Sequence, residues 1–141
     1  MLIVSSSMYY AHSGPTREAW EPLRDHLQDV AKRAASFAEA FGAAEEARLA
    51  GLLHDLGKYS ERFNRRLAGQ ERGLDHWSAG AWAAAARCRN AAVALAVQGH
   101  HTGLQKLDSL QDLRDFDRFA KHHPLGLELT DTSVDALLAR F

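Results

Sequence analysis

The sequence of 141 residues predicts an all-α fold, and three observations support this prediction. Alanine, the strongest helix former, is abundant and supplies five of the six residues 81–86. No alternation of apolar and polar residues over the length of a strand stands out. Apolar residues recur instead at helical spacing, as in the stripe Leu23, Leu27, Val30, Ala34, Phe37 and Phe41. We therefore expect a helical bundle.

Helix start and stop signals place the first elements in order. The first helix is expected over residues 22–41, with Pro22 in its first turn and Gly42 at its end. The second is expected over residues 44–56, with Glu45 and Glu46 in its first turn and Gly57 as its stop. A short third helix over residues 60–67 precedes a loop over residues 69–74.

Further helices are expected over residues 76–87, 91–98 and 107–122. Gly99 closes the helix over residues 91–98, and Pro124 and Gly126 break the chain after the next one. Ser133 caps a last segment that ends at Phe141. Residues 1–16 are expected to be irregular.

The composition is that of one soluble domain. Hydrophobic residues make up 46% and charged residues 25% of the chain, and 141 residues suffice for a single core. The single Cys88 excludes an internal disulfide and fits a reducing compartment, so we expect a cytoplasmic protein. The N-terminus lacks the basic start of a signal peptide, and no run of about 20 apolar residues exists, so no membrane partner is expected.

The charge pattern excludes a strongly basic surface, because the net charge is −1. It leaves room for a local basic path, since residues 58–72 hold five lysine and arginine residues against two glutamates. Such a path fits a nucleic-acid strand. A solvated helix face is the alternative interpretation of the same run.

The pair His54-Asp55 lies within a leucine-rich run and is the most informative feature of the chain. A carboxylate among packed leucines needs a strong partner, because burying an uncompensated charge is costly. A divalent metal ion is the simplest partner, since imidazole nitrogen and carboxylate oxygen both bind such ions. A buried His–Asp hydrogen bond without a metal is the alternative.

Other histidines favour the metal interpretation. His26 falls at helical spacing on the first apolar stripe, and His76 stands at an expected helix start. His100 and His101 end an apolar run, where packing does not explain two adjacent imidazoles. A set of this size suits two metals that share a bridging carboxylate. Four segments thus supply six candidate ligands, namely His26, His54, Asp55, His76, His100 and His101.

These motifs and their order resemble those of the HD phosphohydrolase superfamily. The closer resemblance is to the HD nuclease domain of the CRISPR-associated (Cas-three) helicase-nuclease family of type I systems. It covers about residues 8–105. The matching pieces are Tyr10-Ala11-His12-Ser13, Asp25-His26-Leu27, the run from Leu53 to Lys58, Phe63, the run from Asp75 to Ala81 and the run from Gly99 to Gly103.

The resemblance implies an HD-domain helical bundle with a metal site in its interior. It implies a metal-dependent nuclease that hydrolyses phosphodiester bonds of single-stranded DNA during CRISPR interference, an antiviral defence. The implied cofactors are two divalent metal ions (manganese, nickel, cobalt, iron or magnesium). The implied partners are single-stranded DNA, a helicase domain or subunit, and the CRISPR RNA-guided surveillance complex.

The resemblance also assigns roles to residues. His26, His54 and Asp55 are expected to hold the first metal, and His76, His100 and His101 the second, with Asp55 shared as the catalytic bridge. Lys58 lies one helical turn past His54 and is expected to act in catalysis by offering its ammonium to a phosphate oxygen. The expected substrate-binding residues are Lys58, Ser13, Arg62 and Arg65.

One departure from the family concerns the C-terminal end of the chain. Members continue into a further helix whose acidic residue completes the shell of the first metal. Here that residue is missing, unless Asp131 or Asp135 takes its role. We therefore expect residues 1–141 to be a single HD nuclease domain, truncated at its C-terminal end, with a weak first metal site.

Two other functions remain open at this point. One is an HD phosphohydrolase that acts on small nucleotides, and the other is a catalytically incomplete fragment that acts as a binding module. The run from Gly99 to Gly103 favours the nuclease over the first. The ligand set is complete for one metal, which disfavours the catalytically incomplete binding module.

Overall fold

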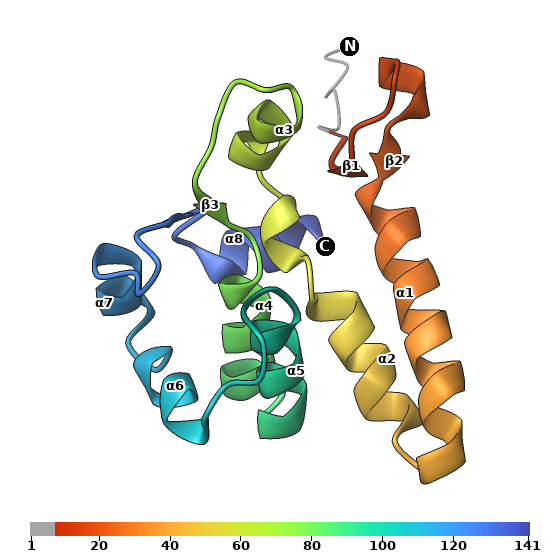
Figure 1. Cartoon of the computed structure of the whole chain (residues 1–141), viewed down its shortest axis with the longest axis vertical. Coiled ribbons are helices and arrows are strands. Elements are labelled where there is room, and N and C mark those ends of the chain that lie inside the picture. The colour runs from red at the N-terminus through yellow and green to blue at the C-terminus, as the bar shows by residue number, and fades with distance from the viewer. Residues whose placement is uncertain (1–7) are drawn as a thin grey trace.

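The computed structural model describes residues 8–141, apart from the side chains of Leu107 and Ser109, and folds as a helical bundle (Figure 1). The predicted all-α fold class is thereby confirmed. Residues 1–7, part of the segment predicted to be irregular, lie outside the described residues. The α-helices are α1 (Leu23–Ala38), α2 (Ala44–Leu53), α3 (Glu61–Leu67), α4 (Ser78–Trp82), α5 (Ala91–Thr102), α6 (Leu107–Asp112), α7 (Phe116–Lys121) and α8 (Val134–Arg140).

Shorter elements join these helices. Three are 3₁₀ turns, η1 (Arg17–Ala19), η2 (Glu39–Phe41) and η3 (Leu56–Lys58), and η4 (Ala83–Arg87) is π-helical. Strands β1 (Tyr10–His12) and β2 (Glu21–Pro22) pair antiparallel above the start of α1 (Figure 1). Strands β3 (Leu74–Asp75) and β4 (Glu128–Leu129) pair in parallel. Strands of two or three residues are too short to produce a visible alternation in the sequence.

Two predicted helix ends near the histidines are wrong. The helix over residues 44–56 ends at Leu53, because the chain turns at Asp55 and the amide of Gly57 donates to the carbonyl of His76 rather than continuing α2. The helix over residues 91–98 continues through Thr102 and ends at Gly103, whose φ of 81° lets the chain leave the helix. Gly99 therefore lies inside α5.

Three other predicted helices also differ from the structure. The first ends as α1 at Ala38 and finishes as the 3₁₀ turn η2. The helix over residues 76–87 begins only at Ser78 and becomes π-helical after Trp82. The helix over residues 107–122 is two helices, because the Asp115 side chain accepts from the amide of Arg118 and caps a new helix, α7.

Helices α1 and α2 lie antiparallel and side by side (Figure 1). Their contact is close, and α1 buries mostly small residues there: Leu23, Leu27, Ala31, Ala35 and Ala38. The predicted stripe through Phe37 and Phe41 is therefore wrong, since these side chains are 78% and 74% exposed. Two helices that approach this closely have no room for a phenylalanine between them.

The main core lies between α2, α4 and α5, and α8 helps to cover it. Buried side chains at its centre include Leu56, Val97 and Leu137, each at most 1% exposed. Because only His54 and Asp55 separate η3 from α2, this core lies against the segment that carries these two residues. None of the helices that the structure describes is long and apolar enough to cross a membrane.

Replacing Gly51 with alanine should destabilise the fold. A Cβ at this position would lie 2.6 Å from Cα of Ala31, which is backbone and yields only if α1 and α2 move apart. Overpacking of this kind costs about 1–3 kcal/mol, more than the gain in helix propensity. Urea denaturation of Gly51→Ala should therefore show a lower free energy of unfolding than the wild type.

The matched control is Gly99→Ala in α5, where the nearest atoms belong to the backbone of Leu104 at 4.0 Å. This variant should be neutral or more stable by up to about 1 kcal/mol, because alanine favours helix more than glycine does. Equal stabilities of the two variants would contradict the close packing of α1 on α2.

Candidate metal centre

Asp55 stands at the centre of the histidine cluster. It follows α2, precedes η3 and is only 3% exposed. Its Oδ2 lies 2.8 Å from Nζ of Lys58, which is itself 5% exposed and donates to the carbonyl of Ala11 at 3.1 Å. The ammonium of Lys58 thus balances the buried carboxylate and ties η3 to β1.

Two imidazoles face Oδ2 of Asp55. His26 projects from the first turn of α1, and its Nε2 lies 3.3 Å from Oδ2. His54 follows α2 directly, and its Nε2 lies 3.1 Å from the same oxygen. The two Nε2 atoms are 3.3 Å apart. We call His26, His54 and Asp55 the first half-site.

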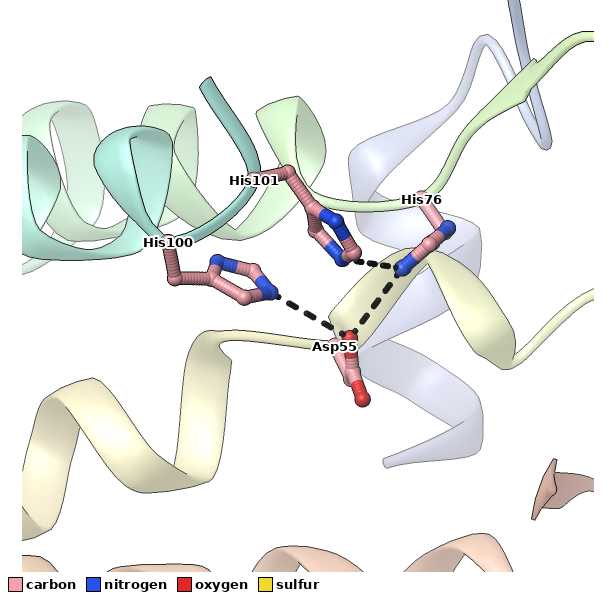
Figure 2. Close-up of side chains that lie close together, drawn as sticks. All are labelled: Asp55, His76, His100 and His101. Atoms are coloured by element: carbon pink, nitrogen blue, oxygen red, sulfur yellow. Dashed lines mark hydrogen bonds and ion pairs between the residues drawn. The ribbon is translucent and has the colours of Figure 1, made fainter. Parts of the chain in front are cut away.

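The other carboxylate oxygen, Oδ1, faces a second group of imidazoles (Figure 2). Nε2 of His76, which follows β3, lies 3.3 Å from Oδ1, and Nε2 of His100 lies 3.7 Å from it. Nε2 of His101 lies 2.8 Å from Nε2 of His76. We call Asp55, His76, His100 and His101 the second half-site.

The structure therefore brings all six candidate ligands together, with Asp55 shared between two compact groups. In each group the ligand atoms lie within 4.8 Å of one another, which is close enough for one metal ion per group. Every imidazole turns Nε2 toward the centre. This arrangement matches the partition expected from the sequence, although the metal-binding role of each residue stays a prediction.

The other ring nitrogen of two of these histidines is held by the main chain. Nδ1 of His54 lies 2.7 Å from the carbonyl of Gly51, and Nδ1 of His100 lies 2.6 Å from the carbonyl of Val97. A carbonyl only accepts hydrogen bonds, so each ring carries a proton on Nδ1. Nε2 is therefore the nitrogen of these two rings that could bind a metal.

The charges at the centre shift several pKa values. Burial alone would raise the pKa of Asp55, but the imidazoles around it lower that pKa well below its usual range. Burial lowers the pKa of His76, and burial together with neighbouring imidazoles lowers the pKa of His101 to about 4. The hydrogen bond to Asp55 raises the pKa of His26. At neutral pH the second half-site thus offers neutral nitrogens at His76 and His101.

The unsatisfied atoms of the centre fit a divalent cation. Oδ1 of Asp55 and Nδ1 of His76 are buried and have no hydrogen-bond partner among the described residues. The Nε2 atoms of His76 and His101 face each other, and only one of them can donate when both rings are neutral. A divalent ion held by Asp55, His76 and His101 would satisfy Oδ1 and these Nε2 atoms, whereas Nδ1 of His76 lies on the other side of its ring and would not meet the ion. Nitrogen and carboxylate donors are the ligands that divalent transition metals take in proteins.

His76 rests on a buried network that was not recognised in the sequence. Asp75 is 2% exposed and accepts at Oδ1 from the amides of Trp77 and Ser78. Its Oδ2 accepts from the Ser78 hydroxyl and lies 2.7 Å from Nε2 of His123. The side chain of His123 is itself buried, at 3% exposed. The pairing of β3 with β4 brings the segment that contains His123 close to Asp75.

Other predicted site residues lie outside the cluster. Ser13 is exposed. Arg62 and Arg65 of α3 both pair with Glu71, and Arg62 also pairs with Glu128. Their substrate-binding role stays a prediction.

The two acidic residues considered as a further ligand of the first metal are engaged elsewhere. Asp131 pairs with Arg140 at 3.1 Å, and Asp135 pairs with Arg87. The structure thus gives the first half-site two histidines and one carboxylate from these segments, without a contribution from Asp131 or Asp135.

A comparison with protein families finds the HD domain over residues 23–123, which is most of the chain. The chain therefore belongs to the HD domain family, which indicates a metal-dependent phosphohydrolase. The matched range contains all six clustered residues. No curated protein matches the chain.

The double variant His54→Ala, Asp55→Ala should lose bound metal, because it removes one ligand from the first half-site and the carboxylate that both share. Elemental analysis after loading with manganese and desalting measures this loss. His101→Ala, at the exposed end of α5, tests the second half-site with little change to the core. The control is His122→Ala, an exposed histidine outside the cluster. Equal metal content in all four proteins would refute the centre.

Asp75→Asn should lower the free energy of unfolding at neutral pH by about 2 kcal/mol, since hydrogen bonds to a buried charged group are lost. Burial acts to raise the pKa of Asp75, but its hydrogen bonds with His123, Ser78 and the backbone lower it overall. A folded-state pKa below the unfolded one stabilises the fold above the unfolded pKa of about 4, and this stabilisation disappears as the pH falls through the folded-state pKa.

The difference between wild type and Asp75→Asn should therefore narrow as the pH falls below about 4. Urea denaturation of both proteins at a series of pH values, with a chelator present, measures this difference in the free energy of unfolding. Asp29→Asn, an exposed residue in the middle of α1, is the control and should leave stability nearly unchanged. A difference that is constant over pH would mean that the charge of Asp75 does not contribute.

Proposed function

We propose that this member of the HD domain family is a metal-dependent nuclease that hydrolyses phosphodiester bonds of single-stranded DNA in CRISPR interference. The observation that carries the proposal is the placement of Asp55 between two groups of imidazoles, with one carboxylate oxygen toward each. Such a centre suits a two-metal hydrolysis of phosphate esters. The order of the sequence motifs supports the nuclease branch of the family.

The residues of the centre divide the chemistry between them. Bound divalent ions supply Lewis-acid stabilisation of the phosphate charge and activation of water. Asp55 contributes both oxygens and holds the two half-sites in fixed relation. Lys58 brings an ammonium to the centre, 2.8 Å from Oδ2 of Asp55, and we propose that it stabilises negative charge on the phosphate during catalysis.

The exposure of the second half-site favours a polymer as substrate. His100 and His101 are exposed at the end of α5, whereas Asp55 beneath them is buried. Gly103 follows with open space around it, and the Leu104 side chain after it is fully exposed. A strand can therefore reach the centre from the end of α5, whereas small nucleotides are commonly bound in enclosed pockets. A flexible single strand brings its phosphate into the recessed centre more easily than a stiff duplex does.

We propose the partners on the sequence resemblance. A helicase domain or subunit would deliver the single strand, and a CRISPR RNA-guided surveillance complex would select the DNA. A cytoplasmic location follows from this role. Ser13, Arg62 and Arg65 are the proposed contacts to the strand, with phosphate taking over part of the pairing that Glu71 now provides to the two arginines.

With manganese present, the chain should cut labelled single-stranded DNA faster than blunt duplex DNA, and cyclic or free nucleotides most slowly. His101→Ala should lower cutting by at least about a hundredfold, since loss of even an outer-shell partner of a metal costs about ten- to a hundredfold. His122→Ala should cut like the wild type.

Binding to DNA should weaken as salt rises, because phosphate contacts release counterions.

The rates are measured on gels for DNA and by phosphate or nucleotide release for small substrates, beside thermal melting of each variant. Faster hydrolysis of small nucleotides would replace the proposal by the small-nucleotide phosphohydrolase. Metal binding without hydrolysis of any of these substrates would replace it by a binding module.

A further inference from the structure

The β1–β2 hairpin places a carboxylate behind His26. Glu21 in β2 lies opposite His12 in β1, directly before Pro22 and the start of α1. Oε1 of Glu21 lies 3.2 Å from Nδ1 of His26, and Oε2 lies 2.6 Å from Nδ1 of His12. Glu21 thus contacts the Nδ1 edge of the His26 ring, whereas Asp55 contacts the Nε2 edge.

The two nitrogens of His26 have different surroundings. Nε2 faces Oδ2 of Asp55 and Nε2 of His54, each at 3.3 Å, whereas Nδ1 faces Glu21. A carboxylate only accepts hydrogen bonds, so Nδ1 must carry the ring proton and donate it to Glu21 whenever Nε2 gives its lone pair to a metal ion. Metal-binding histidines commonly donate their second N–H to such a partner, which fixes the ring and raises its basicity.

We propose that Glu21 is a positioning residue of the first half-site, which holds His26 as the Nδ1–H tautomer with Nε2 aimed at the metal. The inference rests on the proposed metal-dependent function. His12 holds the second oxygen of Glu21 and so keeps the carboxylate turned toward His26. In this way the hairpin, which contributes no predicted ligand, supports the half-site.

Glu21 differs from the anchors of the other two rings. His54 and His100 lean on main-chain carbonyls, those of Gly51 and Val97, which no side-chain substitution removes. The anchor of His26 is a side chain, so a single substitution isolates its effect. Among these three anchored rings, His26 is therefore the one held by a side chain from outside the ligand set.

The experiment compares Glu21→Ala and Glu21→Gln with the wild type, and Glu18→Ala serves as control because it removes an exposed carboxylate from the same connection between β1 and β2. The first measurement is the ring ¹⁵N chemical shifts of His26 by NMR, with chelator present, at about pH 9, far above the ordinary His pKa of about 6.5. Wild type and Glu18→Ala should show a substantial Nδ1–H population of His26, because Glu21 competes with Asp55 for the ring proton.

Glu21→Ala should shift the His26 population toward the Nε2–H tautomer, while His54 keeps its tautomer. Glu21→Gln should largely keep the Nδ1–H form, since the amide oxygen still accepts. A purely structural role of Glu21 would leave the tautomers unchanged. An unchanged His26 tautomer in Glu21→Ala would overturn the proposal whether or not the protein cuts DNA.

The second measurement is calorimetric titration with manganese. Glu21→Ala should lower the manganese affinity of the binding step that depends on His26 by roughly ten- to a hundredfold, and Glu21→Gln should lower this affinity less. If Glu21→Gln loses an ion as completely as Glu21→Ala, Glu21 is a ligand, because His12, Glu21 and His26 also lie close enough to hold an ion themselves. That result overturns the positioning role.

The two proposals fail separately. If the wild-type protein binds manganese but cuts no DNA, the proposed nuclease function is refuted. The manganese affinities of wild type and the Glu21 variants still test the role of Glu21 in that case. Wild-type protein that cuts DNA while Glu21→Ala keeps both tautomer and affinity refutes only the role of Glu21.

Discussion

The buried carboxylate of Asp55 is the constraint on which the rest of the structure depends. An ionised carboxylate in an apolar interior costs several kcal/mol unless charged or hydrogen-bonding partners surround it. Here Lys58 and four imidazoles lie within 3.7 Å of its two oxygens. The bundle supplies these partners because α1, α2, the β3–α4 junction and α5 all end or begin beside η3. The packing of these elements thus supplies the groups that compensate the charge of Asp55.

The two sides of Asp55 differ in access and in charge. On the Oδ2 side, His26 and His54 share the oxygen with the ammonium of Lys58 beneath the β1–β2 hairpin. On the Oδ1 side, His100 and His101 reach solvent at the end of α5. Burial and neighbouring imidazoles keep the His101 pKa near 4, so the exposed side presents a neutral ligand at neutral pH. The Oδ1 side is therefore the more accessible of the two.

A shell of outer contacts holds the imidazoles in place, and its members differ in kind. Main-chain carbonyls hold His54 and His100, the carboxylate of Glu21 holds His26, and the buried network of Asp75 and His123 fixes the segment that precedes His76. Anchors of this type decide how accurately ligands meet a metal. They connect the site to the hairpin at one end of the chain and to the segment around β4 at the other.

Local pattern was sufficient for the fold class and for the candidate ligands. Helical spacing and alanine content predict an all-α bundle, because both act over neighbouring turns. A histidine–aspartate pair in a leucine run, with further histidines at the ends of apolar runs, predicts a cluster, because burying such groups requires partners. The positions of His26, His76 and the His100-His101 pair in space agree with that expectation.

What the sequence by itself did not determine depends on contacts between distant segments. α2 stops at Leu53 because Gly57 bonds to His76, and Phe37 faces solvent because α1 turns a face with three alanines inward instead. Lys58 turns inward to Asp55, and Glu21 and His123 become partners of site residues through two small sheets that leave no periodic signal. Residue type and spacing thus determined which groups could form a centre. Tertiary packing decided which nitrogen and which oxygen meet, because those distances depend on how whole elements approach one another.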